Sequence, residues 1–169
     1  MDVGLAVASK RDWRSYSDQP VPEGVQRRIL DAGRLAGSAV NKQPWRFVIV
    51  ESEDAKQRVS QVVYAEGNIQ TCAFAVAIVT EGGGSAIDVG RAMQNMFLVA
   101  WNEGVVSCPN GISDPQAAAE ALGLPDGWLP VNIPSFAYPK RDLHPTSKSA
   151  EEWSAEANRR PLDELVRRI

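Results

Sequence analysis

The feature that most limits how this chain can fold is the continuous apolar run from Cys72 to Thr80. The run shows no alternation of polar and apolar residues, which is typical of a central strand in a covered sheet. Around it, segments with helical spacing and segments with strand character alternate along the chain. This interleaving predicts a layered α/β or α+β sandwich. The 169 residues are enough for one globular domain with a single sizeable core.

Periodicity and turn residues predict the elements that precede this strand. Residues 2–9 are expected to form a short helix, and apolar residues at helical spacing predict another over residues 23–35. The β-branched residues of the segment 46–50 predict a buried strand. Ser52 is a suitable N-cap for a further helix, which we expect to fade near Ala65.

The elements after the central strand are predicted in the same way. The longest helix is expected over residues 86–102, followed by a short strand at 105–108. A helix capped by Asp114 should end at Gly123. Two prolines assign the extended segment 128–137 to the edge of the sheet. Residues 144–157 are predicted to form an exposed, charge-rich loop, and residues 161–169 a last short helix.

Composition excludes several classes of protein. The net charge of -3 argues against a general nucleic-acid binder, because such proteins usually carry a strong basic excess. No apolar run approaches the roughly 20 residues that cross a bilayer, and Asp2 stands where a signal peptide has a basic start. Cys72 and Cys108 are too few and too far apart for a disulfide framework or a zinc site. We therefore expect a cytoplasmic protein that binds no metal, nucleic acid or membrane.

Cations gather near both ends of the chain and suggest a phosphate-binding site. Charge-assisted hydrogen bonds to a phosphate contribute roughly 1.5–3 kcal/mol each. The alternative is a solvated basic surface, and Asp12 would either repel a phosphate or hold an arginine in place. The cations are Lys10, Arg11, Arg14, Arg159 and Arg160.

Amide and small polar side chains form a second set, which suits a flat heterocycle. Flavins, purines and pterins present alternating donors and acceptors, and a carboxamide can match both. The alternative for each member is an ordinary loop cap. The set consists of Ser38, Asn41, Gln43, Asn68 and Asn110.

The sequence offers no catalytic residue of its own. No pair of carboxylates and no nucleophile–base arrangement stands out. His144 is the only histidine, Cys108 reads as a buried structural cysteine, and the glycines at 82–84 lack the spacing of a phosphate loop. If the protein is an enzyme, its chemistry therefore belongs to a cofactor.

At four places, in the family's order, the chain resembles the FMN-dependent nitroreductases. Members begin with the pattern Arg-Arg-Ser-x-Arg-x-Tyr/Phe-x-Asp-x-Pro-Val and continue with Ala-Pro-Ser-x-x-Asn-x-Gln-Pro-Trp. Here residues 10–21 read KRDWRSYSDQPV and residues 36–45 read AGSAVNKQPW. Residues 88–96 resemble the family's central interface helix, and residues 159–166 resemble its closing signature.

The resemblance implies a three-layer α-β-α sandwich of the α+β class, with a mixed, mainly antiparallel sheet. Residues 1–169 would form a single flavin-binding domain. The protein would be a homodimer with FMN at the subunit interface. NADH or NADPH would serve as reductant, and the partner substrate would be a small planar electron acceptor.

The resemblance assigns the FMN phosphate to the cations at the two ends of the chain. Arg11 would be adjacent to it, and Asp12 stands where the family has a serine that helps to bind phosphate. The residues that would hold the phosphate are Lys10, Arg14 and one or both of Arg159 and Arg160.

The resemblance assigns the flavin ring to the amide set. Asn68 would read the pyrimidine edge, and the loop of Asn110 and Gly111 would bring its backbone toward flavin N5. The residues that would line the isoalloxazine are Ser38, Ala39 and Asn41.

These expectations lead to one principal hypothesis and two alternatives. The principal hypothesis is an FMN-dependent NAD(P)H oxidoreductase that passes electrons to nitroaromatic, quinone or similar planar acceptors by a ping-pong mechanism. The first alternative is a non-catalytic FMN- or nucleotide-binding protein of the same fold. The second is an interaction module without ligand, whose main contact surface is the helix over residues 86–102.

Overall fold

The computed structural model describes residues 1–82 and 85–169, so Gly83 and Gly84 of the glycine run lie outside the described residues. One sheet organises the described chain, with strand order β1-β2-β5-β3 and β4 paired with β2. All of these strand pairs are antiparallel, and an isolated parallel bridge joins Asp12 to Ser107. The strands are β1 (Trp45–Val50), β2 (Phe74–Glu81), β3 (Val106–Cys108), β4 (Trp128–Asn132) and β5 (Ser135–Ala137).

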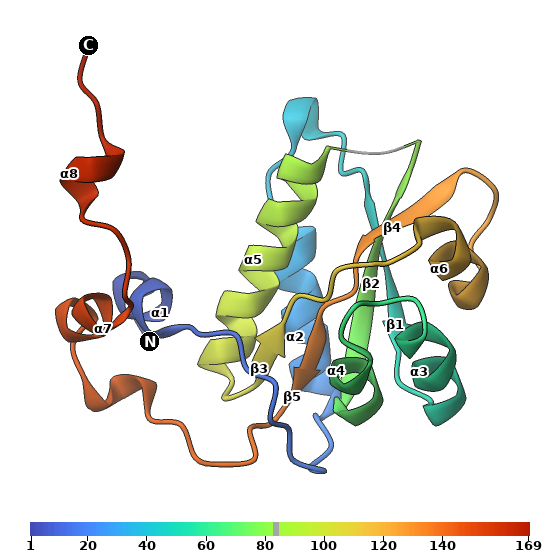
Figure 1. Ribbon diagram of the computed structural model, residues 1–169, viewed down its shortest axis with the longest axis horizontal. Coiled ribbons are helices and arrows are strands. Elements are labelled where there is room, and N and C mark those ends of the chain that lie inside the picture. The colour runs from blue at the N-terminus through green and yellow to red at the C-terminus, as the bar shows by residue number, and fades with distance from the viewer. Residues whose placement is uncertain (83–84) are drawn as a thin grey trace.

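Helices cover both faces of this sheet (Figure 1). Helices α2 and α5 pack together on one face, and α3, α4 and α6 lie on the other. The α-helices are α1 (Val3–Ser9), α2 (Glu23–Arg34), α3 (Glu53–Ser60), α4 (Glu66–Thr71), α5 (Ala86–Asn102), α6 (Pro115–Leu122), α7 (Ala150–Glu156) and α8 (Leu162–Leu165). Two 3-10 turns, η1 (Ala39–Asn41) and η2 (Pro145–Ser147), complete the described elements.

Strand β2 explains why the molecule has three layers. Successive side chains of a strand point to opposite faces, and both faces of β2 are apolar. Phe74 and Ile78 belong to the core shared with α2 and α5, whereas Ala75 and Val79 belong to the core beneath α3 and α4. Each large side chain buried in this way contributes about 1.5–3 kcal/mol. The predicted central strand and the three-layer α+β sandwich are therefore confirmed.

Helix α5 is the longest element and lies close against α2. Ser85 caps its N-terminus by accepting a hydrogen bond from Asp88 N at 3.4 Å. A Cβ atom at Gly33 of α2 would lie 2.9 Å from the Met96 side chain and 2.9 Å from the Phe47 ring. Only glycine fits there, so the sequence enforces the close approach of the two helices.

Three of the predicted elements differ in the structure. The helix expected to fade near Ala65 ends at Ser60, and a separate helix, α4, begins at Glu66 and contains Asn68. The segment 128–137 divides into β4 and β5, and β5 is an inner strand between β2 and β3 rather than an edge. Residues 144–157 contain η2 and α7 rather than a plain loop, because Ser149 and Glu152 form a capping box that starts α7.

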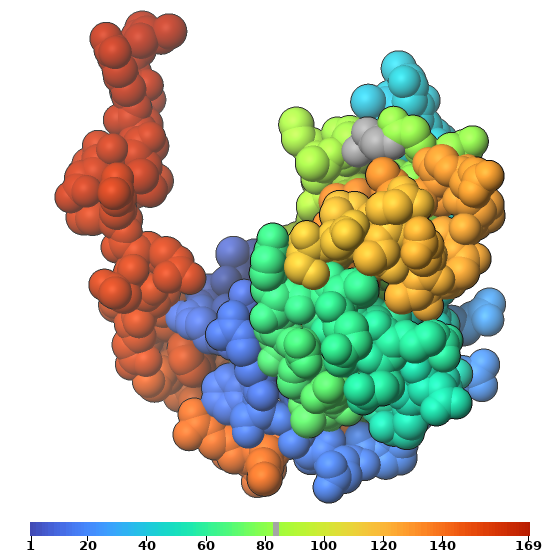
Figure 2. Space-filling model, turned by 45° about the vertical axis from the view of Figure 1, so that its right-hand side comes forward, coloured from blue at the N-terminus to red at the C-terminus, as the bar shows by residue number. Residues whose placement is uncertain are grey.

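The C-terminal segment stands away from the body of the molecule. Helix α7 packs on α1, and α8 and the residues after it project outward (Figures 1 and 2). This projecting segment exposes large apolar side chains, among them Leu162 and Ile169. In the part of the chain that the structure describes, the helices are all too short or too polar to cross a membrane.

Candidate functional site

The first predicted cation segment runs beside strand β3. Trp13 N donates to Ser107 O at 3.1 Å, which fixes the segment against the strand. The Lys10 side chain is only 9% exposed, and its Nζ lies 4.3 Å from the centre of the Phe97 ring. Lys10 also forms an ion pair with Asp12. The ammonium group is therefore held at the C-terminal half of α5, with part of its charge already balanced.

Arg11 and Arg14 have different surroundings. The Arg11 guanidinium donates to Ala8 O at 2.7 Å and to Trp153 O at 3.1 Å, so it ties α7 to α1. Arg14 is exposed and lies beside Cys108. Burial raises the pKa of the Cys108 thiol, and the nearby Arg14 charge opposes that rise. Arg14 thus remains available to a ligand, whereas Arg11 is occupied by the protein.

Arg159 and Arg160 lie just beyond α7. Both are exposed, and Arg159 Nη1 donates to Ala157 O at 2.8 Å. The contact between Arg11 and Trp153 brings this part of the chain to the same side of the molecule as the first cation segment. The structure thus places them near α1 without joining them to Lys10 or Arg14.

Asn68 and Asn110 meet in the interior. Asn68 Nδ2 donates to Asn110 Oδ1 at 2.8 Å and lies 3.8 Å from Cys108 Sγ. Because Cys108 also adjoins Arg14, strand β3 brings a cation and the two amides together. This grouping of Arg14, Asn68 and Asn110 around Cys108 is the cationic and amide half of the predicted site.

The loop of Asn110 and Gly111 has a tight backbone. Asn110 N donates to Asn132 Oδ1 at 3.1 Å, so this N–H is already engaged within the chain. Gly111 O accepts from Tyr64 N at 3.0 Å, and a Cβ at Gly111 would come within 3.1 Å of the Tyr64 ring. The Asn110 N–H is therefore not available for the predicted approach to a flavin. Within this loop, that predicted role is left to the backbone of Gly111.

The loop around η1 forms the other half. Ala39 N lies 3.4 Å from Asp88 Oδ2, and Gln43 N donates to Ser38 Oγ at 2.9 Å. Val40 and Asn41 have positive φ angles of 44° and 56°. Such a conformation is strained for a β-branched residue, costs about 1–3 kcal/mol and is typical of functional sites.

The two halves lie apart within one chain. The loop contacts Asp88 near the start of α5, whereas Lys10 contacts Phe97 nine residues further along, about 13 Å at 1.5 Å per residue. Figure 1 shows η1 at one end of α5 and the N-terminal segment toward the other. Ser38, Ala39 and Asn41 are therefore not brought together with the predicted phosphate residues.

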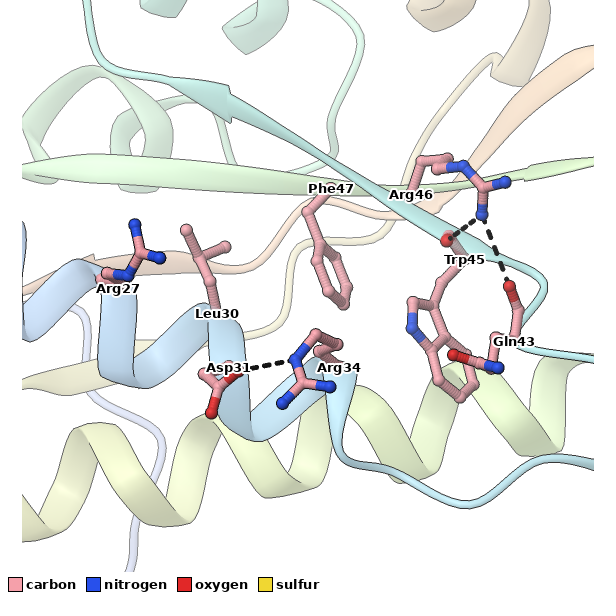
Figure 3. Close-up of a pocket in the computed structure, with 8 residues that line it drawn as sticks. All are labelled: Arg27, Leu30, Asp31, Arg34, Gln43, Trp45, Arg46 and Phe47. Carbon is pink, nitrogen blue, oxygen red and sulfur yellow. Dashed lines mark hydrogen bonds and ion pairs between the residues drawn. The ribbon is translucent and has the colours of Figure 1, made fainter. Parts of the chain in front are cut away.

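A cavity of about 450 Å³ lies elsewhere, between α2 and β1 (Figure 3). Its floor is apolar and its rim is charged, with Arg34 paired to Asp31 at 2.6 Å and Arg46 Nη1 donating to Trp45 O at 2.9 Å. Gln43 is the one member of the predicted amide set among the described residues that line it. Its lining consists of Arg27, Leu30, Asp31, Arg34, Gln43, Trp45, Arg46 and Phe47.

Sequence reasoning missed the residues that support the amides. Ser135, Tyr16 and Asn132 contact Asn110 directly or through one another, yet they come from three distant segments. Each is an ordinary polar or aromatic residue in its own segment. These residues come together only because β3 pairs with β5, and no local sequence pattern predicts that pairing.

Comparison with known proteins shows that the chain is similar to nitroreductases. The family model described as "Nitroreductase family" matches residues 7–81 and 79–138. A "Putative NADH dehydrogenase/NAD(P)H nitroreductase" of Methanothermobacter thermautotrophicus is 26% identical over 90% of this chain and 88% of its own length. The "FMN reductase [NAD(P)H]" of Bacillus subtilis is 21% identical, over 89% of this chain and 69% of its own length.

The fold has a close counterpart among solved structures. A putative nitroreductase of Desulfovibrio desulfuricans, solved in complex with FMN, superposes with a TM-score of 0.80. The match covers 98% of this chain and 96% of that one, at 24% sequence identity. At this level of identity the likeness establishes the shared fold.

Proposed function

The chain belongs to the nitroreductase family of FMN-dependent oxidoreductases, and from that premise we propose that it passes electrons from NADH or NADPH to small planar acceptors such as nitroaromatics and quinones. The two substrates would use the site in turn, in a ping-pong mechanism. The flavin, when bound, supplies the redox chemistry by accepting a hydride and handing electrons on. The chain's own residues bind it, orient it and exclude water.

The residues of the cationic and amide half fit such a cofactor. Arg14 is exposed and would form charge-assisted bonds with a phosphate, while the buried Asn68 supplies a fixed amide for a heterocycle. Lys10 would add a second charge, reduced by its ion pair with Asp12. The observation that carries the proposal is this meeting of cation and amide beside β3.

We propose that the flavin site is completed between two copies of the chain in a homodimer. In a two-fold dimer each contact is reciprocal. If two α5 helices pack antiparallel, the start of one lies beside the end of the other, because the 17-residue helix is only about 25 Å long. The η1 loop of one copy would then adjoin the Lys10 and Arg14 segment of the other, and residues 1–169 would act as one flavin-binding domain.

Exposed side chains support this arrangement. Ile87 on α5 is 76% exposed and lines a hollow of about 410 Å³ with Gly90 and Arg91. The projecting C-terminal segment adds Leu162 and Ile169. Apolar groups of this kind are typical of surfaces that pack against a second subunit.

The absorption spectrum of the purified protein tests the cofactor. We expect a yellow protein, or one that becomes yellow with added FMN, and bleaching by NADH or NADPH without oxygen. Steady-state oxidation of the nicotinamide with a quinone or nitroarene tests turnover. Protein that binds FMN without turnover would favour the non-catalytic binder, and protein that binds no FMN would contradict the proposal.

A further inference from the structure

The orientation of the Asn110 side chain follows from its neighbours. One end of its amide lies 2.8 Å from Ile133 O and 3.3 Å from Cys108 O. Backbone carbonyls only accept hydrogen bonds, so this end must be the nitrogen, Nδ2. A third contact, 3.1 Å to Ser135 Oγ, agrees with this assignment. The two hydrogens of Nδ2 are shared among these three acceptors, and this holds the amide of Asn110 in one orientation.

The orientation of the Asn110 amide also fixes the orientation of the Asn68 amide. Asn110 Oδ1 can only accept, so Asn68 must present its own Nδ2 to it, at 2.8 Å. Asn68 Oδ1 then faces away and accepts no hydrogen bond from the described residues. Among the described residues, Ser107 Oγ is the only side-chain oxygen or nitrogen that is fully buried and has no hydrogen-bond partner. Asn68 Oδ1 thus keeps access to solvent, although the residue is only 7% exposed.

Ser135 and Tyr16 extend the chain of bonds. Ser135 Oγ donates to Cys108 O at 3.3 Å and accepts from Asn110. The Tyr16 hydroxyl lies 2.8 Å from Ser135 Oγ, and either oxygen can be the donor in this bond. Burial raises the pKa of Tyr16, which keeps this hydroxyl protonated. All four side chains are buried, so water does not compete for these bonds.

We propose that Tyr16, Ser135 and Asn110 are positioning residues that fix Asn68 as a one-way hydrogen-bond acceptor. The site would then prefer a ring that presents an N–H at this edge, as the imide of a flavin does. A ring that presents an acceptor or a methyl group would be rejected, because Asn68 cannot turn its amide without breaking the chain. The proposal rests on the proposed function, since it takes the flavin ring as the ligand.

Titration of the wild-type protein with FMN and with its N3-methylated analogue tests this directly. We expect FMN to bind at least about tenfold more tightly, since a site built to hydrogen-bond a group rejects the analogue that lacks it. Equal affinity for both flavins would overturn the positioning role while leaving the proposed function intact. Failure to bind either flavin would contradict the proposed function, and with it this inference.

Variants separate positioning from general stability. In Asn110→Ala the amide of Asn68 is free to turn, so the preference for FMN should fall to within about threefold. Tyr16→Phe, which keeps the ring in place, should lower the preference by a smaller factor and serves if the first variant does not fold. Thr71→Ala is the matched control, because Thr71 lies on the same helix and bonds only Gly67 O. An unchanged preference in both test variants would overturn the proposal.

Discussion

The two halves of the proposed flavin site are built in opposite ways. Asn68 and Asn110 are buried and joined by a hydrogen bond of 2.8 Å within one chain. The η1 loop is exposed, and Val40 holds a positive φ angle with 88% of its surface exposed. The side chains of the first half are fixed in the interior by hydrogen bonds, whereas the second half holds a costly backbone conformation at the surface. The difference agrees with our proposal that this loop meets the second copy of the chain and the flavin.

The largest contrast should appear on truncating one amide in each half. Asn110→Ala removes the donor to Ile133 O, leaves Asn68 Nδ2 without its acceptor and should lower the free energy of unfolding by about 2–4 kcal/mol. Asn41→Ala, in the exposed loop, should lower it by only about 1 kcal/mol, because alanine tolerates the positive φ angle of Asn41 less well than asparagine does, while weakening FMN binding. Urea denaturation measures both values. A similar loss in both variants would contradict the contrast.

The buried Cys72 thiol should make the free energy of unfolding depend on alkaline pH. Burial raises the pKa of Cys72 to about 12, so the folded thiol stays protonated where the unfolded one ionises. The stabilisation is complete below about pH 8.5 and is lost as the pH rises toward the folded pKa, at about 1.4 kcal/mol per pH unit. Between about pH 9.5 and 11, the free energy of unfolding of Cys72→Ala should therefore fall less steeply than that of the wild type, by about 1.4 kcal/mol per pH unit. An unaltered slope in Cys72→Ala would show that the thiol is not the group responsible.

The cations should affect ligand binding rather than stability. Arg14→Gln is expected to raise the Kd for FMN by about 10- to 100-fold, because one charge-assisted bond is lost. Asp12→Ser should lower the Kd several-fold by removing a carboxylate that pairs with Lys10. Arg58→Gln is the control, since Arg58 is exposed on α3. Equal effects of Arg14→Gln and Arg58→Gln on binding would place the phosphate elsewhere.

The smallest effect should come from relieving the strained backbone. Val40→Gly removes the side chain that opposes a positive φ and should raise the free energy of unfolding by up to about 1 kcal/mol. Val7→Gly offers the matched control, because Val7 is an exposed valine within helix α1. There the same substitution should lower stability by about 0.5–1 kcal/mol. Destabilisation of similar size in both variants would show that Val40 stores no strain.

Much of the fold was predictable because its signals are local. The apolar run of β2, the cap of the helix that ends at Leu122 and the long helix α5 each stand in contiguous residues. The inner position of β5 was not predictable in this way. Pro130 and Pro134 indicated an edge, but Pro134 falls between β4 and β5, so the strand that follows it can pair on both sides.

The residues of the proposed site could be chosen from the sequence, but their arrangement could not. The motif residues Arg14 and Asn68 could be chosen from the sequence, and the structure brings both beside Cys108. The hydrogen bond from Arg11 to Trp153 O could not be foreseen, because it depends on the packing of α7 against α1. The separation of the η1 loop from the cations could not be foreseen either, because it depends on how the helix α5 lies between them in the folded chain.

Mixing two defective homodimers tests the shared site most directly. Arg14→Glu should abolish FMN binding from the cationic half, and Ala39→Trp should block it from the exposed loop. If each site takes one half from each chain, exchange of subunits recreates one intact site in every mixed dimer. FMN binding should then recover to about a quarter of the wild-type level after random exchange. No recovery, with exchange verified by native mass spectrometry, would contradict a site built from two chains.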